Sequence, residues 1–204
     1  MEIQIYNKAY VCRTKEHLWF QETKDALIAI GMNEMAATDI AQRSDGENFF
    51  NAASKSRARE ISQTVIRRVG VVNNDFINYF GMQNVGNQKI LVLVMVMLED
   101  RTFFDFMNEI FREKSVIGDY NLNDAEIIRF IHNLQEKDEK AATWSDASIQ
   151  KLKLYIKNLL KDSGMLKTEK KTSTIVRPII TPDFKEFLEN ENLNVIENIL
   201  MGVR

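Results

Sequence analysis

The most apolar run of the chain, Ile90 to Leu98, places the strongest constraint on the fold. Its nine residues are far fewer than the roughly 20 that a helix needs to span a bilayer, so we do not expect a membrane protein. Valines in the run favour a strand, whereas its leucine and methionine content favours a helix. Because no strand-and-turn pattern flanks the run, we predict that residues 88–99 form a buried helix at the core.

The scarcity of turn-forming residues extends this prediction to the rest of the chain. Only two prolines and eight glycines occur among 204 residues, and a many-stranded sheet would need more of them in its turns. We therefore predict a mainly α-helical globular protein. The dipeptide Asp45-Gly46 is typical of turns, so we expect a loop over 43–48. The expected helices cover residues 17–32, 34–42, 55–69, 75–80, 88–99, 101–114, 124 to about 135, 146–162, 183–190 and 194–201.

The segment 55–69 combines a helical stripe with an unusually basic character. Ala58, Ile61, Val65 and Val69 recur at steps of three and four and define its buried side. Five of its other eleven positions are basic and one is acidic, which suits a phosphate-rich partner. An ordinary solvated helix face explains the same pattern about equally well. The candidate DNA contacts in this helix are Lys55, Ser56, Arg57, Arg59, Arg67 and Arg68.

The pattern changes after Gly164. A polar, basic turn over 167–173 precedes β-branched residues over 174–180, which predicts a short β-hairpin with a basic tip. Helix, polar turn, capped helix and basic hairpin is the element order of a winged helix-turn-helix. We therefore expect an N-terminal helical subdomain, residues 1–114, and a C-terminal winged-helix-like subdomain, residues 115–204. The candidate DNA contacts in the second subdomain are Lys151, Lys153, Lys157, Lys170 and Lys171.

The net charge of −2 conceals a segregated distribution of charge. Five basic residues and one acidic residue lie in 51–68, and eight basic and two acidic residues lie in 151–177. In contrast, residues 99–139 contain eleven acidic and five basic residues. A helix that enters the major groove needs Arg, Lys, Asn, Gln or Ser near its start, and both basic segments offer them. We expect binding to duplex DNA that weakens steeply with salt.

Catalytic and metal-binding motifs are sparse. The single cysteine, Cys12, excludes an internal disulfide and a multi-cysteine zinc site. The carboxylates of Asp105, Glu109 and Glu113 recur at four-residue steps and could hold a divalent ion for a nuclease, although a solvated helix face explains them more simply. We expect no catalytic residue, no metal and no cofactor. The N-terminus lacks a secretion signal, which predicts a cytoplasmic protein.

Two stretches of the chain carry a resemblance to a known family. One is FFNAASKSRAREISQTVIRRV, residues 49–69, and the other is TWSDASIQKLKLYIKNLLKDSGML, residues 143–166. Their composition, order and separation resemble the BrxA family of bacteriophage-exclusion (BREX) phage-defence systems. The resemblance covers most of the chain.

The resemblance implies a mostly helical protein with helix-turn-helix motifs that binds double-stranded DNA. It implies no enzymatic activity, and a role in defence beside a methyltransferase and ATPase-type partners. One departure is that the segment between Gln42 and Lys55 is longer than the three- or four-residue turn of a standard helix-turn-helix. The alternative function is therefore a protein-interaction adaptor whose basic face docks an acidic partner. The DNA-facing residues that the resemblance implies are Lys55, Ser56, Arg57, Arg59, Lys151 and Lys153.

Overall fold

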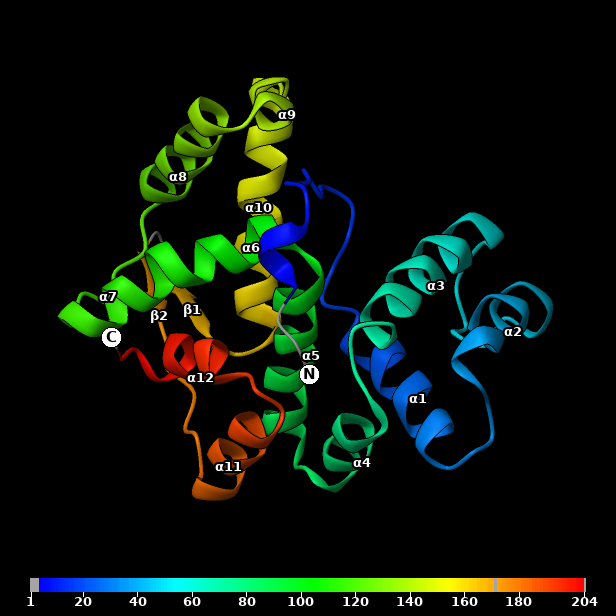
Figure 1. Ribbon diagram of the computed structural model, residues 1–204. Helices are drawn as coiled ribbons and strands as arrows, with labels where there is room; N and C mark the ends of the chain where they lie inside the picture. Colours follow the sequence, from blue (N-terminus) through cyan, green and yellow to red (C-terminus); the bar gives the residue numbers. More distant parts are fainter. Residues whose placement is uncertain (1–3, 171, 204) are drawn as a thin grey trace.

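A buried helix, α5 (Val85–Glu99), lies at the centre of the molecule (Figure 1). The structure is a computed structural model, and it describes residues 4–170 and 172–203. Every side chain from Leu91 to Met97 is fully buried, with Ile90 and Leu98 nearly so. The predicted core helix is therefore confirmed. Asn84 caps its start by accepting a hydrogen bond from the backbone N–H of Asn87 at 3.0 Å.

The helices that precede α5 in the chain lie to one side of it, on the right in Figure 1. Ile61 and Val65 of α3 and Leu27 of α1 are buried in the core that these helices share with α5. Asn73 caps α4 by accepting from the backbone N–H of Phe76 at 2.9 Å. The elements are α1 (Phe20–Gly31), the 3-10 turn η2 (Ala37–Asp39), α2 (Ile40–Glu47), α3 (Lys55–Val69) and α4 (Asn74–Met82).

The expected loop over 43–48 is wrong, because α2 continues through Asp45 and Gly46 to Glu47. The helix ends only where Asn48 adopts a left-handed conformation, with φ of 48°. Ser44 anchors this part of α2, since its hydroxyl donates to the carbonyl oxygen of Ala58 in α3 at 3.1 Å. Tertiary packing thus overrides the local turn tendency of Asp-Gly.

The elements that follow α5 cover its other side. Phe103, Phe106 and Phe130 belong to the buried core there, and the rings of Phe106 and Phe130 meet edge to face at 5.6 Å. The elements are α6 (Arg101–Phe106), a π-helical segment η3 (Met107–Phe111), α7 (Arg112–Ile117), α8 (Asp124–Lys137), α9 (Glu139–Ala142), α10 (Asp146–Asp162), β1 (Leu166–Glu169), β2 (Thr172–Ile175), α11 (Pro182–Asn190) and α12 (Asn194–Met201).

The predicted hairpin is confirmed as an antiparallel pair, β1 with β2, in which Leu166 faces Ile175. Both side chains are buried, so the base of the hairpin packs on the core while its tip is exposed. Asn121 adds an isolated antiparallel bridge to Thr174 of β2. The helix that precedes the hairpin begins at the cap residue Ser145, whose hydroxyl accepts from the N–H of Ser148 at 3.3 Å.

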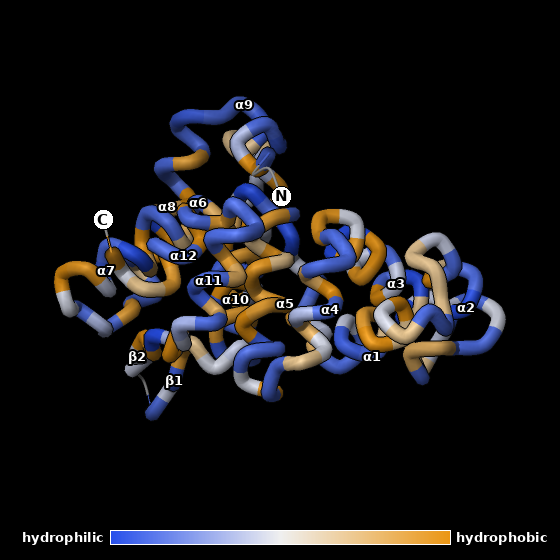
Figure 2. Tube along the Cα trace, turned by 60° about the horizontal axis from the view of Figure 1, so that its bottom comes forward, coloured by the Kyte–Doolittle hydropathy of each residue, from blue (hydrophilic) through white to orange (hydrophobic). Residues whose placement is uncertain are grey.

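Colouring by hydropathy shows apolar segments gathered at the centre and polar segments outside (Figure 2). The protein is thus mainly helical with one small hairpin near its C-terminus, which confirms the predicted fold class. Within the described ranges, none of the helices combines the length and the apolar character that crossing a bilayer requires.

Candidate nucleic-acid interface

The first turns of α3 present an exposed basic surface. Ser54 caps the helix by accepting from the N–H of Arg57 at 3.2 Å. The side chains of Lys55, Ser56 and Arg59 are exposed. Arg59 forms an ion pair of 3.3 Å with Asp45 of α2, and both side chains are more than half exposed, at 66% and 52%. Such an exposed pair is weak, so Arg59 is free to exchange Asp45 for a phosphate or a base.

Well-defined contacts hold the connection between α2 and α3, residues 48–54. The side chain of Asn48 donates to the carbonyl oxygen of Ala52 at 3.1 Å and accepts from its N–H at 2.9 Å. Phe50 is buried, and the ring of Phe49 lies 5.0 Å from the guanidinium of Arg43. The connection is longer than a standard helix-turn-helix turn, yet its contacts fix how α3 is presented.

Arg57 has partners within the protein. Its guanidinium lies 4.9 Å from the centroid of the Trp19 ring and 3.1 Å from a carboxylate oxygen of Glu60. Trp19 itself has a φ of 41°, an uncommon backbone conformation for a bulky residue, at the position that precedes α1. Arg57 therefore helps to join α3 to the start of α1, and only part of its side chain faces solvent.

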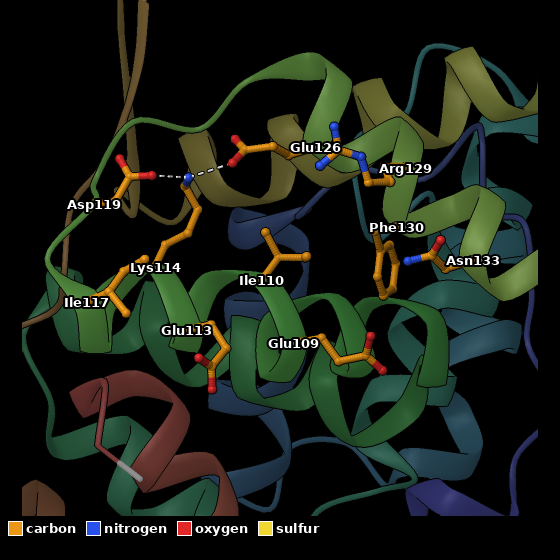
Figure 3. A pocket seen from close by; sticks show the side chains of 10 residues that line it. All are labelled: Glu109, Ile110, Glu113, Lys114, Ile117, Asp119, Glu126, Arg129, Phe130 and Asn133. Atoms are coloured by element: carbon orange, nitrogen blue, oxygen red, sulfur yellow. Dashed lines mark hydrogen bonds and ion pairs between the residues drawn. The ribbon is translucent and has the colours of Figure 1, made fainter.

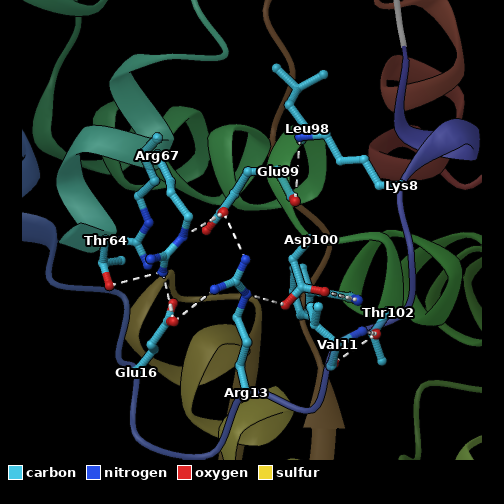
Figure 4. A network of polar contacts seen from close by, with 12 residues as sticks. Lys8, Val11, Arg13, Glu16, Thr64, Arg67, Leu98, Glu99, Asp100 and Thr102 are labelled. Atoms are coloured by element: carbon cyan, nitrogen blue, oxygen red, sulfur yellow. Dashed lines mark hydrogen bonds and ion pairs between the residues drawn. The ribbon is translucent and has the colours of Figure 1, made fainter. Parts of the chain in front are cut away.

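Arg67 belongs to a network of ion pairs at the junction between the two sides of the molecule (Figure 4). Its guanidinium contacts Glu16 at 2.6 Å and Glu99 at 3.1 Å. Arg13 contacts the same two carboxylates at 2.8 and 3.0 Å, and Asp100 at 3.2 Å. Burial lowers the pKa of the Arg13 guanidinium, but the three carboxylates outweigh this and raise it. These arginines are structural partners of buried carboxylates.

The prediction that Arg68 contacts DNA is wrong, because its side chain is fully buried. The guanidinium donates to the carbonyl oxygens of Leu18 and His17, the latter at 2.7 Å, and to the hydroxyl of Thr23 at 3.2 Å. Burial lowers the pKa of Arg68, since the interior disfavours its charge. Arg68 thus fixes the backbone that leads into α1 and cannot reach a ligand on the surface.

The lysines of α10 differ in how free they are. Lys151 is exposed, whereas Lys153 and Lys157 are mostly covered and form ion pairs with Asp124 at 3.0 and 2.6 Å. Hydrogen bonds from Lys157 and Lys153 lower the pKa of the Asp124 carboxyl. These two lysines therefore join α10 to the start of α8, and DNA would have to displace Asp124 to use them.

The hairpin keeps its basic character at the tip. Lys167 and Lys170 are exposed, and Lys170 lies in the turn with a left-handed φ of 54°. Lys171 lies outside the described residues. Figures 1 and 2 both show the hairpin on one side of α5 and α3 on the other, so the two basic surfaces are separate.

The charge pattern of the sequence does not identify the buried polar groups that join the segment before α1 and helix α10 to α6. Asp100 is fully buried, accepts from the N–H of Phe103 at 3.2 Å and from the Tyr155 hydroxyl at 3.2 Å, and thereby joins α6 to α10. Burial raises the pKa of Asp100 to about 6, more than its contact with Arg13 lowers it. The Tyr10 hydroxyl likewise donates to Asp105 at 2.8 Å.

The carboxylates that recur at four-residue steps, Asp105, Glu109 and Glu113, do not form a single cluster. Asp105 is buried against Tyr10, whereas Glu109 and Glu113 are exposed and line a hollow of about 230 Å³ beside Phe130 (Figure 3). The π-helical segment η3 shifts the phase of the helix between them. Among the residues that the structure describes, no three His, Cys, Asp or Glu side chains meet closely enough to hold a metal ion.

Lys114 closes the other end of this hollow. Its ammonium contacts Asp119 at 2.6 Å and Glu126 at 2.7 Å (Figure 3). Glu126 also accepts from the N–H of Asn123 at 2.8 Å, which forms a capping box at the start of α8. Four carboxylates and two cations line the hollow, so it is acidic and differs in charge from the surface of α3.

By its fold and surfaces, the molecule is a mainly helical protein with a short C-terminal hairpin and with one helix, α3, whose first turns are exposed and basic. The BrxA family model matches residues 10–192. The BREX protein BrxA of Bacillus cereus (strain H3081.97) is 32% identical over 201 residues, which cover 98% of each chain. The chain therefore belongs to the BrxA family of BREX phage-defence systems, as the resemblance predicted.

A solved structure extends the comparison of folds. The crystal structure of an uncharacterized protein from Magnetospirillum magneticum superposes with a TM-score of 0.79, covering 96% of this chain and 100% of that one. The two sequences are 14% identical, so the likeness shows a shared fold alone.

Proposed function

We propose that this BrxA-family protein is a non-enzymatic, double-stranded DNA-binding component of a bacterial phage-defence system. The observation that carries the proposal is the exposed start of α3, where Lys55, Ser56 and Arg59 face solvent while the other side of the helix is buried. Exposed Lys, Arg and Ser side chains near a helix start are the groups that contact phosphates and base edges. Together with a DNA partner we propose a cytoplasmic location.

The pairing of α2 with α3 supports a helix-turn-helix interpretation of this surface. The two helices pack together, and the hydrogen bond from Ser44 to Ala58 and the ion pair of Asp45 with Arg59 connect them. In a helix-turn-helix the second helix enters the major groove while the first crosses the backbone. In this arrangement α3 is the recognition helix.

The C-terminal elements support a second, winged-helix contact. The order α8, α9, α10, β1 and β2, with the bridge from Asn121 to Thr174, resembles that of a winged helix. The exposed Lys151, Lys167 and Lys170 would contact phosphates from the helix and the wing. We propose that these residues add affinity that is independent of base sequence.

The adaptor function has support at a different surface. Met32, 65% exposed at the end of α1, lines a hollow of about 270 Å³ together with Ile28 and Phe80, and Met82 at the end of α4 is 75% exposed. Exposed methionines are common at protein-binding surfaces. A methyltransferase or an ATPase of the same defence system would dock there without competing with DNA at α3.

Charge reversal at α3 tests the proposal. Lys55→Glu combined with Arg59→Glu should weaken binding to a duplex of about 25 base pairs by at least roughly tenfold at 50 mM salt, because both cations become repulsive to phosphate. Fluorescence anisotropy measures the affinity. Both side chains are exposed, so circular dichroism and the melting temperature should stay near those of the unchanged protein.

The matched control reverses two exposed lysines in the acidic part of the chain, Lys137→Glu with Lys140→Glu. It changes the net charge equally but should affect binding far less. For the unchanged protein, the logarithm of affinity should fall with that of salt, with a slope of about −0.9 per phosphate contacted. No binding of any duplex at 50 mM salt would refute the proposed function, and equal losses in both variants would refute the role of α3.

A further inference from the structure

The outermost line of α3 contains uncharged groups that can distinguish bases. Helical residues advance by about 100°, so positions seven apart lie on the same side. Ser56 and Gln63 are seven apart, and both are exposed. They point away from the buried stripe of Ala58, Ile61 and Val65. Gln63 therefore occupies the line of α3 that would lie deepest in a major groove.

Gln63 is free to make new hydrogen bonds. Its amide has no side-chain hydrogen bond or ion pair within the described part of the chain, whereas the neighbouring charged residues do. Arg57 is held by Trp19 and Glu60, and Arg67 by Glu16 and Glu99. Of the residues that face outward along α3, Gln63 and Arg59 thus combine exposure with a bidentate hydrogen-bonding group.

From this arrangement we propose that α3 reads DNA sequence, with Gln63 and Arg59 as the specificity-determining residues. This inference rests on the proposed function and adds base recognition to it. A glutamine amide matches the N6 donor and N7 acceptor of adenine, and an arginine fork matches O6 and N7 of guanine. Gln63 follows Arg59 by one helical turn, so the two side chains reach neighbouring base pairs. Ile66, 37% exposed at the next turn, offers an apolar contact for a thymine methyl group.

The experiment selects bound sequences from a duplex library with a randomised centre, using the full-length protein at about 150 mM salt. The unchanged protein should enrich a short element that contains a guanine and an adenine within a few base pairs. Replacing the preferred adenine by another base should weaken binding roughly 5- to 150-fold. Gln63→Ala should abolish that discrimination at one position and leave the salt slope unchanged.

Two further variants distinguish the recognition of bases from electrostatic attraction to the phosphates. Arg59→Lys keeps the charge but loses the fork, so it should lose discrimination at the guanine with little change in affinity for other sequences. Lys55→Ala should weaken every sequence alike, reduce the salt slope by about one, and leave discrimination intact. All three side chains are exposed, so the substitutions should not unfold the protein.

The outcomes distinguish this inference from the proposed function. Tight binding without enrichment of any sequence would overturn the inference that α3 recognises bases, but it would leave the proposed binding to duplex DNA intact. Enrichment that survives Gln63→Ala and Arg59→Lys would also overturn it, because another element would then be the reader. Failure to bind any duplex at 50 mM salt would overturn both.

Discussion

Arg68 shows at the residue scale how one guanidinium can hold a fold together. It is fully buried and donates to two backbone carbonyls and to Thr23. The contact with the Leu18 carbonyl oxygen is buried, so that oxygen carries a desolvation cost when it loses its donor. The side chain also fills space that a smaller residue would leave empty.

Arg68→Ala should therefore lower the free energy of unfolding by roughly 2 to 5 kcal/mol. Urea unfolding followed by circular dichroism measures the change. Arg59→Ala serves as the control, since the same deletion at an exposed position should change stability little. An Arg68→Ala protein of normal stability that has lost DNA binding would restore Arg68 as a DNA contact.

The sequence contains a signal for the burial of Arg68 that its charge conceals. Arg68 follows Ile61 by seven residues and Val65 by three, so the same periodicity that identifies the buried stripe also places Arg68 beside it. Arg57, four residues before Ile61 and eleven before Arg68, shares nearly the same side of the helix although it stays partly exposed, whereas Arg67 carries no such signal. Their partners, Trp19 and Glu99, are distant in sequence, and only the tertiary structure brings them close.

At the scale of elements, periodicity predicts the long helices well and local turn tendencies less well. The bounds of α3 and α10 match the predicted ranges, because each has a serine cap and a continuous apolar stripe. The end of α2 was misplaced, since Asp45-Gly46 is helical when Ser44 is anchored to α3. The π-helical segment η3 has no simple sequence signal, and it separates the side chain of Asp105 from those of Glu109 and Glu113.

The link between α6 and α10 through Asp100 should make stability depend on pH. Burial raises the pKa of Asp100 from 3.8 to about 6 in the folded protein, so the folded state binds more protons than the unfolded state between these values. The contribution of Asp100 to the free energy of unfolding is fully present below pH 4 and is lost as the pH rises through 6. Carboxyls with a lowered pKa, such as Asp119 and Asp124, act in the opposite direction and only near or below pH 4.

Asp100→Asn should remove this dependence, since the amide does not ionise; its oxygen can still accept from the Phe103 N–H, and its nitrogen can donate to the Tyr155 hydroxyl. The free energy of unfolding of the variant relative to the unchanged protein should rise by on the order of 2 to 3 kcal/mol between pH 4 and pH 7. Urea titrations at half-unit pH steps measure it. The Asp124→Asn control should lack this rise, and a difference independent of pH would contradict the interpretation of Asp100.

At the scale of the whole molecule, α5 separates two basic surfaces that the sequence shows only as two segments. The start of α3 lies on one side and the hairpin on the other (Figures 1 and 2). The ion pairs of Arg13 and Arg67 with Glu16 and Glu99 fasten the two sides to each other. Charge counts along the chain predict how many cations are available, but they cannot predict that Lys153, Lys157, Arg67 and Arg68 have partners inside the protein.

If one duplex contacts both surfaces, affinity should depend on the length of the DNA. Binding through a second surface on the same molecule raises the effective concentration of its partner, so affinity should rise steeply once the duplex spans both. We expect that step between about 10 and 25 base pairs, because a helix of the length of α3 already covers several base pairs of groove. Anisotropy titrations with a series of duplex lengths measure it.

Charge reversal in the hairpin locates the second surface. Lys167→Glu with Lys170→Glu should remove the step and leave binding of the shortest duplexes unchanged, because α3 is untouched. Lys55→Glu with Arg59→Glu should instead weaken binding at every length. An equal effect of the hairpin variant on short and long duplexes would mean that the hairpin and α3 act on the same short segment. A smooth dependence on length in the unchanged protein would mean that DNA contacts only one of the two surfaces at a time.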